Sequence, residues 1–179
     1  MSSLHNFRLP TWGLALLPFV LFLPTLVSFV IDEPGAVWVE FPGVFFHLAL
    51  LLLVSRLDAP DWAKAAGYGW IAIDLLSGIL TINGVPDEIT WPVRLGGHVL
   101  AGVWLAMSSV ALRRPLVTAV GVVTGVWLGG CSFVIAHAPE WILAPSSILI
   151  MVWFAMLAWV HRPGVRDGVG AADGRAATD

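Results

Sequence analysis

Six apolar segments follow one another along the chain, separated only by short polar breaks. A helix needs roughly 17–25 residues to cross the hydrocarbon core of a bilayer. The breaks carry turn-forming sequences such as DEPG, NGVPDE and HAPEW. The pattern predicts an all-α, polytopic membrane bundle of six transmembrane helices. The segments cover approximately residues 12–31, 41–57, 65–83, 92–112, 115–137 and 141–160.

The composition excludes an ordinary soluble domain. Hydrophobic residues make up 58% of the chain and charged residues only 12%, whereas a soluble domain carries about 25% charged residues. So few polar residues do not cover the surface of one globule, and we expect the lipid bilayer to contact most of it. Ten tryptophans against one tyrosine indicate indole rings at the membrane interfaces. The expected localisation is the cell membrane, as a multi-pass protein of a bacterial inner membrane.

The chain offers no segment that reads as a soluble domain, so nucleic acid is not an expected partner. We expect residues 1–161 to form the six-helix transmembrane domain. Residues 162–179 are rich in Gly, Ala and Asp without apolar periodicity, which predicts a disordered cytoplasmic tail. The first apolar segment is not expected to be a cleaved signal peptide, because it is long, contains Pro18 and Pro24, and lacks a small-residue cleavage site.

The distribution of charge predicts the orientation. Basic residues accumulate on the cytoplasmic side of a membrane protein. If the N-terminus is inside, eight of the nine basic residues fall inside and only Arg94 does not. Both termini are therefore expected to be cytoplasmic. In this arrangement six acidic residues fall outside: Asp32, Glu33, Glu40, Asp87, Glu88 and Glu140.

Two stripes of polar residues at helical spacing occur on the third and fourth segments. Charged side chains avoid lipid, so both stripes should face the interior of the bundle and each other. The stripe on the third segment consists of Asp74, Ser77, Gly78 and Thr81. The stripe on the fourth consists of Arg94, His98, Ala101, Leu105 and Ser108.

Asp74 is the most informative single residue. An aspartate at the centre of a spanning helix costs about 2.5–3.5 kcal/mol on insertion scales. In low dielectric its carboxyl should be protonated unless a cation holds it ionised. A neutral carboxyl can act as a general acid or as a proton carrier. The alternative is a structural role, in which Asp74 only ties helices together through hydrogen bonds.

His47 and His98 allow three interpretations. They can be packing histidines bonded to a neighbouring hydroxyl or carbonyl, acid/base partners of Asp74, or axial ligands of one haem. A rise of 1.5 Å per residue places His98 roughly 9 Å below Pro92, and Asp74 roughly 13–14 Å below the same surface. We therefore predict that Asp74 and His98 share a polar pocket in the outer half, with His47 on its wall. Nothing else indicates a haem, so no cofactor is expected.

Arg94 also has alternatives. It can bind an anionic group or hold Asp74 ionised, or it can extend to the interface and pair with Asp87 or Glu88. We expect it near the mouth of the pocket.

Three further features of the sequence indicate packing or, more weakly, a site. His137 and Glu140 at i,i+3 spacing are weak evidence for a metal, so no metal site is predicted. The single Cys131 is expected to be an inert buried thiol. Glycines at four-residue spacing on the fifth segment favour close helix packing. They are Gly121, Gly125 and Gly129.

The favoured function is a membrane-embedded enzyme, of isomerase, cyclase or lyase type, acting on an isoprenoid- or lipid-like substrate. The alternatives are a small proton- or cation-linked transporter or channel, and an accessory subunit of a membrane complex. The enzyme is favoured because the polar residues gather toward one leaflet, whereas a conducting path continues to both sides. The expected catalytic residues are Asp74, His98 and His47. The expected substrate-binding residues are Arg94, Asn83, Trp70 and Trp104. The indole rings of the two tryptophans would stabilise a cationic intermediate.

The orientation can be tested with reporter fusions. Fusions at Asp61 and Arg114 should report the cytoplasm, and fusions at Asp87 and Glu140 should report the opposite side, because the basic residues follow that division. A cytoplasmic signal at Asp87 would contradict the predicted topology.

Overall fold

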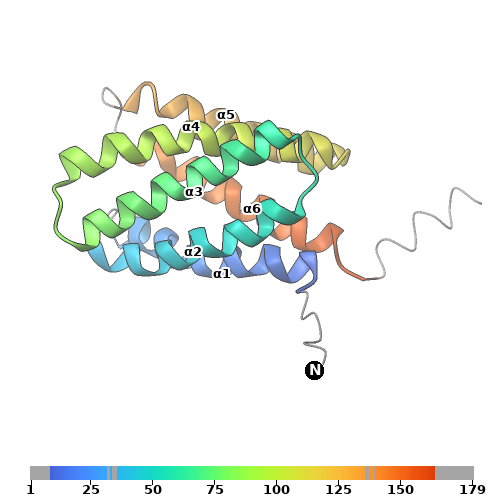
Figure 1. Cartoon of the computed structure of the whole chain (residues 1–179), viewed down its shortest axis with the longest axis horizontal. Coiled ribbons are helices and arrows are strands. Elements are labelled where there is room, and N and C mark those ends of the chain that lie inside the picture. The colour runs from blue at the N-terminus through green and yellow to red at the C-terminus, as the bar shows by residue number, and fades with distance from the viewer. Residues whose placement is uncertain (1–8, 32, 34–35, 136–137, 139, 164–179) are drawn as a thin grey trace, which may run out of the picture.

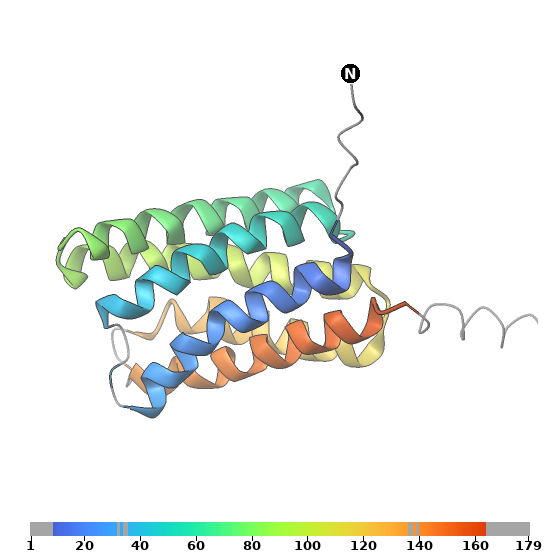
Figure 2. The ribbon, with the colours of Figure 1, turned by 90° about the horizontal axis from the view of Figure 1, so that it is seen from below.

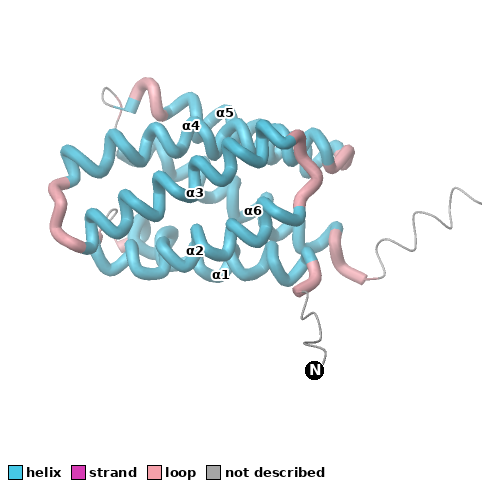
Figure 3. Tube along the Cα trace, in the orientation of Figure 1, coloured by secondary structure: helices cyan, strands magenta, loops and turns pink. Residues whose placement is uncertain are grey.

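The computed structural model describes residues 9–31, 33, 36–135, 138 and 140–163, and all regular structure in these residues is helical (Figure 3). The predicted all-α bundle of six helices is confirmed. His137 and the predicted tail from residue 164 onward lie outside the described residues. The helices are α1 (Thr11–Val30), α2 (Val37–Arg56), α3 (Asp61–Ile82), α4 (Asp87–Ala111), α5 (Pro115–Cys131) and α6 (Ala144–Val160), with a 3-10 helix, η2 (Glu140–Leu143), before α6.

The six helices form a ring in chain order (Figures 1 and 2). Each helix packs against the next, and α6 packs against α1 to close the ring. Successive helices run in opposite directions, so α2, α4 and α6 begin at the end where α1, α3 and α5 finish. We call this the cavity end, for the reason given below, and the other the closed end.

Five of the helices are long and apolar enough to cross a membrane: α1, α2, α3, α4, and α6 taken together with its preceding turn from Trp141. This supports a multi-pass membrane protein in contact with lipid. The fifth helix, α5, has 17 residues and is shorter than the others. Its crossing of the bilayer and the cytoplasmic location of both termini stay predictions.

Three helices begin four to five residues before the apolar segments that predicted them, and α2 is one of these, since it starts at Val37. α3 starts at Asp61 and α4 at Asp87, directly after Pro60 and Pro86. Proline is common at the start of a helix, because a backbone N–H there has no partner within the helix and its absence costs nothing. Acidic residues in the first turn also interact favourably with the positive end of the helix dipole. The helices therefore extend through polar residues that an apolar window leaves out.

α5 is shorter than predicted, because it ends at Cys131 and does not continue toward residue 137. The adjacent Gly129 and Gly130 have low helix propensity. Beyond them the chain tightens into i→i+3 hydrogen bonds, from Phe133 N to the Gly130 oxygen (3.2 Å) and from Val134 N to the Cys131 oxygen (3.0 Å).

Aromatic side chains fill the middle of the ring. Trp104, Trp153 and Phe154 are all 0% exposed, and their ring centroids lie 5.5 Å (Trp104–Trp153) and 5.4 Å (Trp153–Phe154) apart. Trp70 adjoins them at 5.8 Å from Trp104. The prediction of interfacial indoles is wrong for these tryptophans, which build the core. It agrees with six exposed tryptophans near helix ends: Trp38, Trp62, Trp91, Trp127, Trp141 and Trp159.

The predicted close packing of the α5 glycines is confirmed. A Cβ atom added at Gly125 would collide with the backbone oxygen of Gly102 on α4, and one added at Gly121 would collide with Ser109. Gly129 also faces α4, with its Cβ position 3.6 Å from Val99 Cα. Small residues bring two helix backbones this close without loss of packing.

Gly125→Ala should destabilise the protein by roughly 1–3 kcal/mol, because the added methyl group overpacks the α4–α5 contact. Gly130→Ala on the same helix is the matched control, since nothing lies within 4 Å of its Cβ position. Its effect should be neutral or slightly stabilising. Thermal unfolding in detergent, followed by circular dichroism, measures both. Equal midpoints for the two variants would contradict the packing described.

Candidate functional site

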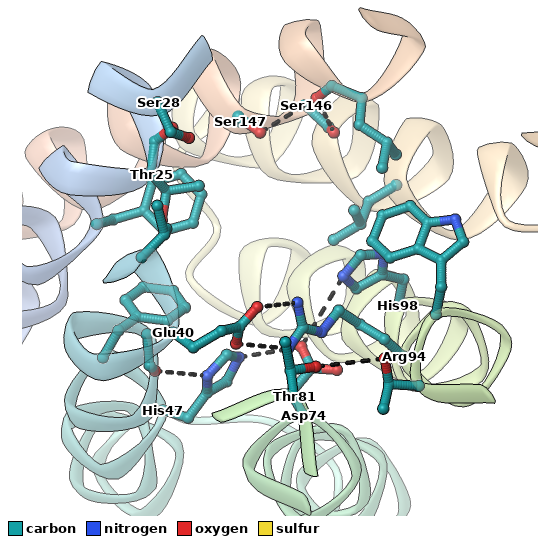
Figure 4. A pocket seen from close by; sticks show the side chains of 18 of the residues that line it. Thr25, Ser28, Glu40, His47, Asp74, Thr81, Arg94, His98, Ser146 and Ser147 are labelled. Carbon is teal, nitrogen blue, oxygen red and sulfur yellow. Dashed lines mark hydrogen bonds and ion pairs between the residues drawn. The ribbon is translucent and has the colours of Figure 1, made fainter. Parts of the chain in front are cut away.

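A cavity of about 620 Å³ occupies the ring at the cavity end (Figure 4). Residues of all six helices line it. A volume of this size lies within the roughly 300–1,000 Å³ range of small-molecule sites. The predicted shared pocket is present, because Asp74, His98, His47 and Arg94 all line this cavity. Their catalytic and binding roles stay predictions.

Asp74 brings side chains of three helices together. It lies on α3 and is only 4% exposed. Its Oδ2 accepts a hydrogen bond from Trp70 Nε1 at 2.7 Å. The same oxygen lies 3.0 Å from Nε2 of His47 on α2 and 3.9 Å from Nε2 of His98 on α4. The carboxyl group is therefore the centre of the polar cluster, as Figure 4 shows.

The contacts of His47 define where its protons lie. Its Nδ1 is 2.8 Å from the carbonyl oxygen of Gly43, and because a carbonyl only accepts, Nδ1 must carry a proton. Nε2 then carries a second proton only when the ring is charged. The contact with Asp74 at 3.0 Å thus holds one labile proton. The ring holds that proton in an ion pair, or the carboxyl holds it in a neutral pair.

His98 stands apart from this pair. Its 3.9 Å contact with Asp74 is longer than a hydrogen bond, and its buried Nδ1 has no hydrogen-bond partner in the described part of the chain.

Because His47 and His98 both direct Nε2 to one carboxylate oxygen, the geometry does not favour the haem interpretation. Within the described ranges, no group of three His, Cys, Asp or Glu side chains is arranged to hold a metal ion.

Arg94 pairs with a residue that the sequence placed outside the bundle. Its Nη1 and Nη2 donate to the two carboxylate oxygens of Glu40 at 2.7 and 2.6 Å. The apolar segment predicted from the sequence starts at residue 41, one residue after Glu40. Instead α2 begins at Val37 and Glu40 is 7% exposed. Neither Asp87 nor Glu88, the partners considered for Arg94, forms this pair.

One signal in the sequence points to Glu40. It precedes His47 by seven residues, which places both on the same face of a helix. That face of the helix points into the interior of the bundle, because His47 is expected there. The interior position of Glu40 therefore follows once the helix is extended by one turn.

Two glycines make room for the carboxylates. A Cβ atom at Gly78 would lie 3.0 Å from Oε2 of Glu40, and one at Gly97 would lie 2.8 Å from Oδ1 of Asp74. A larger residue at either position would push the carboxylate away. Gly78 belongs to the predicted polar stripe, whereas Gly97 was not singled out.

The other predicted binding residues are divided between the cavity and the rest of the protein. Trp70 lines the cavity. Trp104 does not, and is completely buried in the aromatic core. Asn83 is exposed at the end of α3, where its Nδ2 donates to the Ile79 oxygen at 2.7 Å. Cys131 is buried, as expected.

Comparison with known proteins adds no further guide to the function. No protein-family model matches the chain, and neither a curated protein nor a solved structure matches it. The function is therefore argued from the cavity and the residues that line it.

The Glu40–Arg94 pair should be a strong contact between α2 and α4. Replacing either residue alone by leucine strands a partly buried charge and should cost about 3 kcal/mol or more. The Glu40→Leu/Arg94→Leu double variant should lose clearly less than the sum of the single losses. Unfolding midpoints in detergent measure the cycle, with the exposed Asp61→Asn as control. Additive losses would contradict a direct pair.

Proposed function

We propose that this protein is a membrane-embedded enzyme that binds a lipophilic small molecule in the cavity and transfers protons to and from it. Asp74 and His47 act as the general acid, and His98 acts as the general base. The observation that carries the proposal is the 3.0 Å contact between Asp74 Oδ2 and His47 Nε2 on the wall of a 620 Å³ cavity, and the contact of His47 Nδ1 with the Gly43 oxygen assigns one labile proton to this pair.

The geometry supports an isomerisation in particular. The Asp74–His47 pair donates its proton to the substrate, and the Trp70 N–H stabilises the carboxylate that remains. Neutral His98 takes a proton from another carbon of the same substrate. The proton then returns from His98 to Asp74 across 3.9 Å. Protons balance over the cycle, and no oxidant, reductant or second substrate is required.

The surroundings of the pair suit a lipophilic substrate. Phe22, Phe46 and Trp70 line the cavity wall, and Phe22 and Phe46 pack against each other at 5.0 Å between ring centroids. Apolar walls accept an isoprenoid- or lipid-like chain, and aromatic faces stabilise a cation formed on protonation. The open end of the cavity gives such a molecule a way in.

The same structure favours an enzyme over a transporter or channel. A conducting path needs polar groups that continue toward both ends. Toward the closed end, the interior is filled by Leu53, Trp104, Trp153 and Phe154, each 0% exposed. Within the described residues, the cavity therefore does not continue to the closed end. Transport would require the aromatic core to separate, whereas proton transfer within the cavity needs no such change.

The proposal can be tested without knowing the product. The protein is reconstituted in liposomes of bacterial polar lipids supplemented with farnesol, in deuterated water. Reversible proton transfer should place solvent deuterium on carbon in a recovered lipid, which mass spectrometry detects. Asp74→Asn should lower the rate of incorporation by roughly 10²-fold or more, because the amide keeps the shape of the side chain but holds no transferable proton.

Asp61→Asn is the matched control, because it makes the same change on the same helix at an exposed position. It should leave the incorporation unchanged. Circular dichroism should show both variants folded. Incorporation that is equal in the wild type and in Asp74→Asn would overturn the proposed function.

A further inference from the structure

The charges that line the cavity do not cancel. Glu40 and Arg94 neutralise each other in a two-pronged pair. Asp74 and His47 with their shared proton are also neutral as a pair. Asp87 and Glu88 remain, both on the first turn of α4, exposed and lining the cavity. Among the described residues neither forms an ion pair, so the cavity carries a net negative charge.

The hydroxyl groups opposite this cluster accept hydrogen bonds more readily than they donate them. The Ser28 hydroxyl donates to the backbone carbonyl oxygen of Thr25 at 2.7 Å. The Ser146 and Ser147 hydroxyls donate to the backbone carbonyl oxygen of Leu143 at 2.7 and 3.2 Å. The protons of these three hydroxyls are therefore used by backbone carbonyls three or four residues earlier in the chain, and the oxygen lone pairs remain for a ligand. Figure 4 shows these serines facing the charged cluster from across the cavity.

The deepest polar group also has an unused acceptor. Asp74 is 96% buried, since only 4% of it is exposed, and it lines the cavity. Its Oδ1 has no hydrogen-bond partner within the described residues. A buried acceptor without a partner is costly unless a ligand or water satisfies it. The lining thus offers acceptors at the mouth, on the serine side and at Asp74, while the donors of Arg94 are already engaged with Glu40.

The size and walls of the cavity favour an organic molecule over a small inorganic ion as the occupant. A volume of about 620 Å³ is suited to an organic molecule, and aromatic side chains line much of it. Phe22, Phe29, Phe46 and Trp91 are among them. Aromatic faces attract organic cations. Negative charge, acceptor groups and aromatic walls all select the same kind of ligand.

We propose that the substrate of this site is a lipophilic amine, bound as its ammonium ion with the charge near Asp87 and Glu88. The inference rests on the proposed function, because it names the substrate class of that cavity. The N–H groups of an ammonium match the acceptors at Asp87 and Glu88 and on the serine side of the cavity. Its apolar part occupies the aromatic wall beside the Asp74–His47 pair.

Three probes that share a phenylalkyl tail and differ in their head group separate the effect of charge from the effect of apolarity. They are phenylbutylamine, phenylbutanol and phenylbutyrate. Their binding is measured by equilibrium dialysis against the full-length protein in nanodiscs of zwitterionic lipid, with empty nanodiscs subtracted. The amine should bind tightest and the carboxylate weakest. The preference for amine over alcohol should fall roughly fivefold to tenfold in Asp87→Asn/Glu88→Gln at low salt, and high salt should reduce it in the wild type.

Asp58→Asn/Asp61→Asn is the matched control, because it removes two exposed carboxylates at the closed end. It should keep the preference for the amine. Equal or tighter binding of phenylbutanol or phenylbutyrate to the wild type would overturn the amine as substrate class, and proton transfer measured by deuterium incorporation would be unaffected by that result. Equal loss of preference in the two double variants would also overturn it. Absence of saturable binding by all three probes would overturn the amine as substrate class, whereas the proposed function is overturned only by its own deuterium measurement.

Discussion

A buried carboxyl group is the constraint on which the rest of this structure depends. Asp74 lies in the middle of a helix that is otherwise apolar, and such a group is stable in a membrane only if neighbouring helices supply partners. His47 from α2 and His98 from α4 approach it, and Trp70 donates from its own helix. The packing of α3 between α2 and α4 is therefore also the arrangement that makes Asp74 tolerable.

The Glu40–Arg94 pair follows the same principle, because each of its charges is stabilised by a partner on another helix. It lies nearer to the cavity end than Asp74 does. Glu40 and Arg94 join α2 and α4 directly and lie beside Gly78 of α3. The missing side chain at Gly78 lets the pair reach across α3, and the missing side chain at Gly97 leaves space for Asp74. Both charged contacts thus depend on a glycine of the neighbouring helix, and charge and small residues act together.

Much of this arrangement follows from the sequence because membrane physics leaves few choices. A charged residue in lipid must face inward, and helical rise places Asp74, His47 and His98 at similar depths, so their meeting could be predicted. The Glu40–Arg94 pair could not be predicted, because the apolar segment began one residue after Glu40 and the pair joins residues 54 positions apart. The aromatic core was missed for a different reason. Tryptophan is favoured both at interfaces and in packed interiors, and composition does not distinguish Trp104 from an interfacial indole.

The ring has a consequence for the order in which the protein assembles. Every helix packs on the one synthesised just before it, and the contact of α6 with α1 is the one that closes the ring. When α3 enters the bilayer, His47 is already there to meet Asp74, and when α4 follows, Glu40 is already there to meet Arg94. Each costly residue therefore inserts next to a waiting partner. The chamber is complete only when the last helix joins the first, so a nascent chain without α6 has its charged contacts but no enclosed binding site.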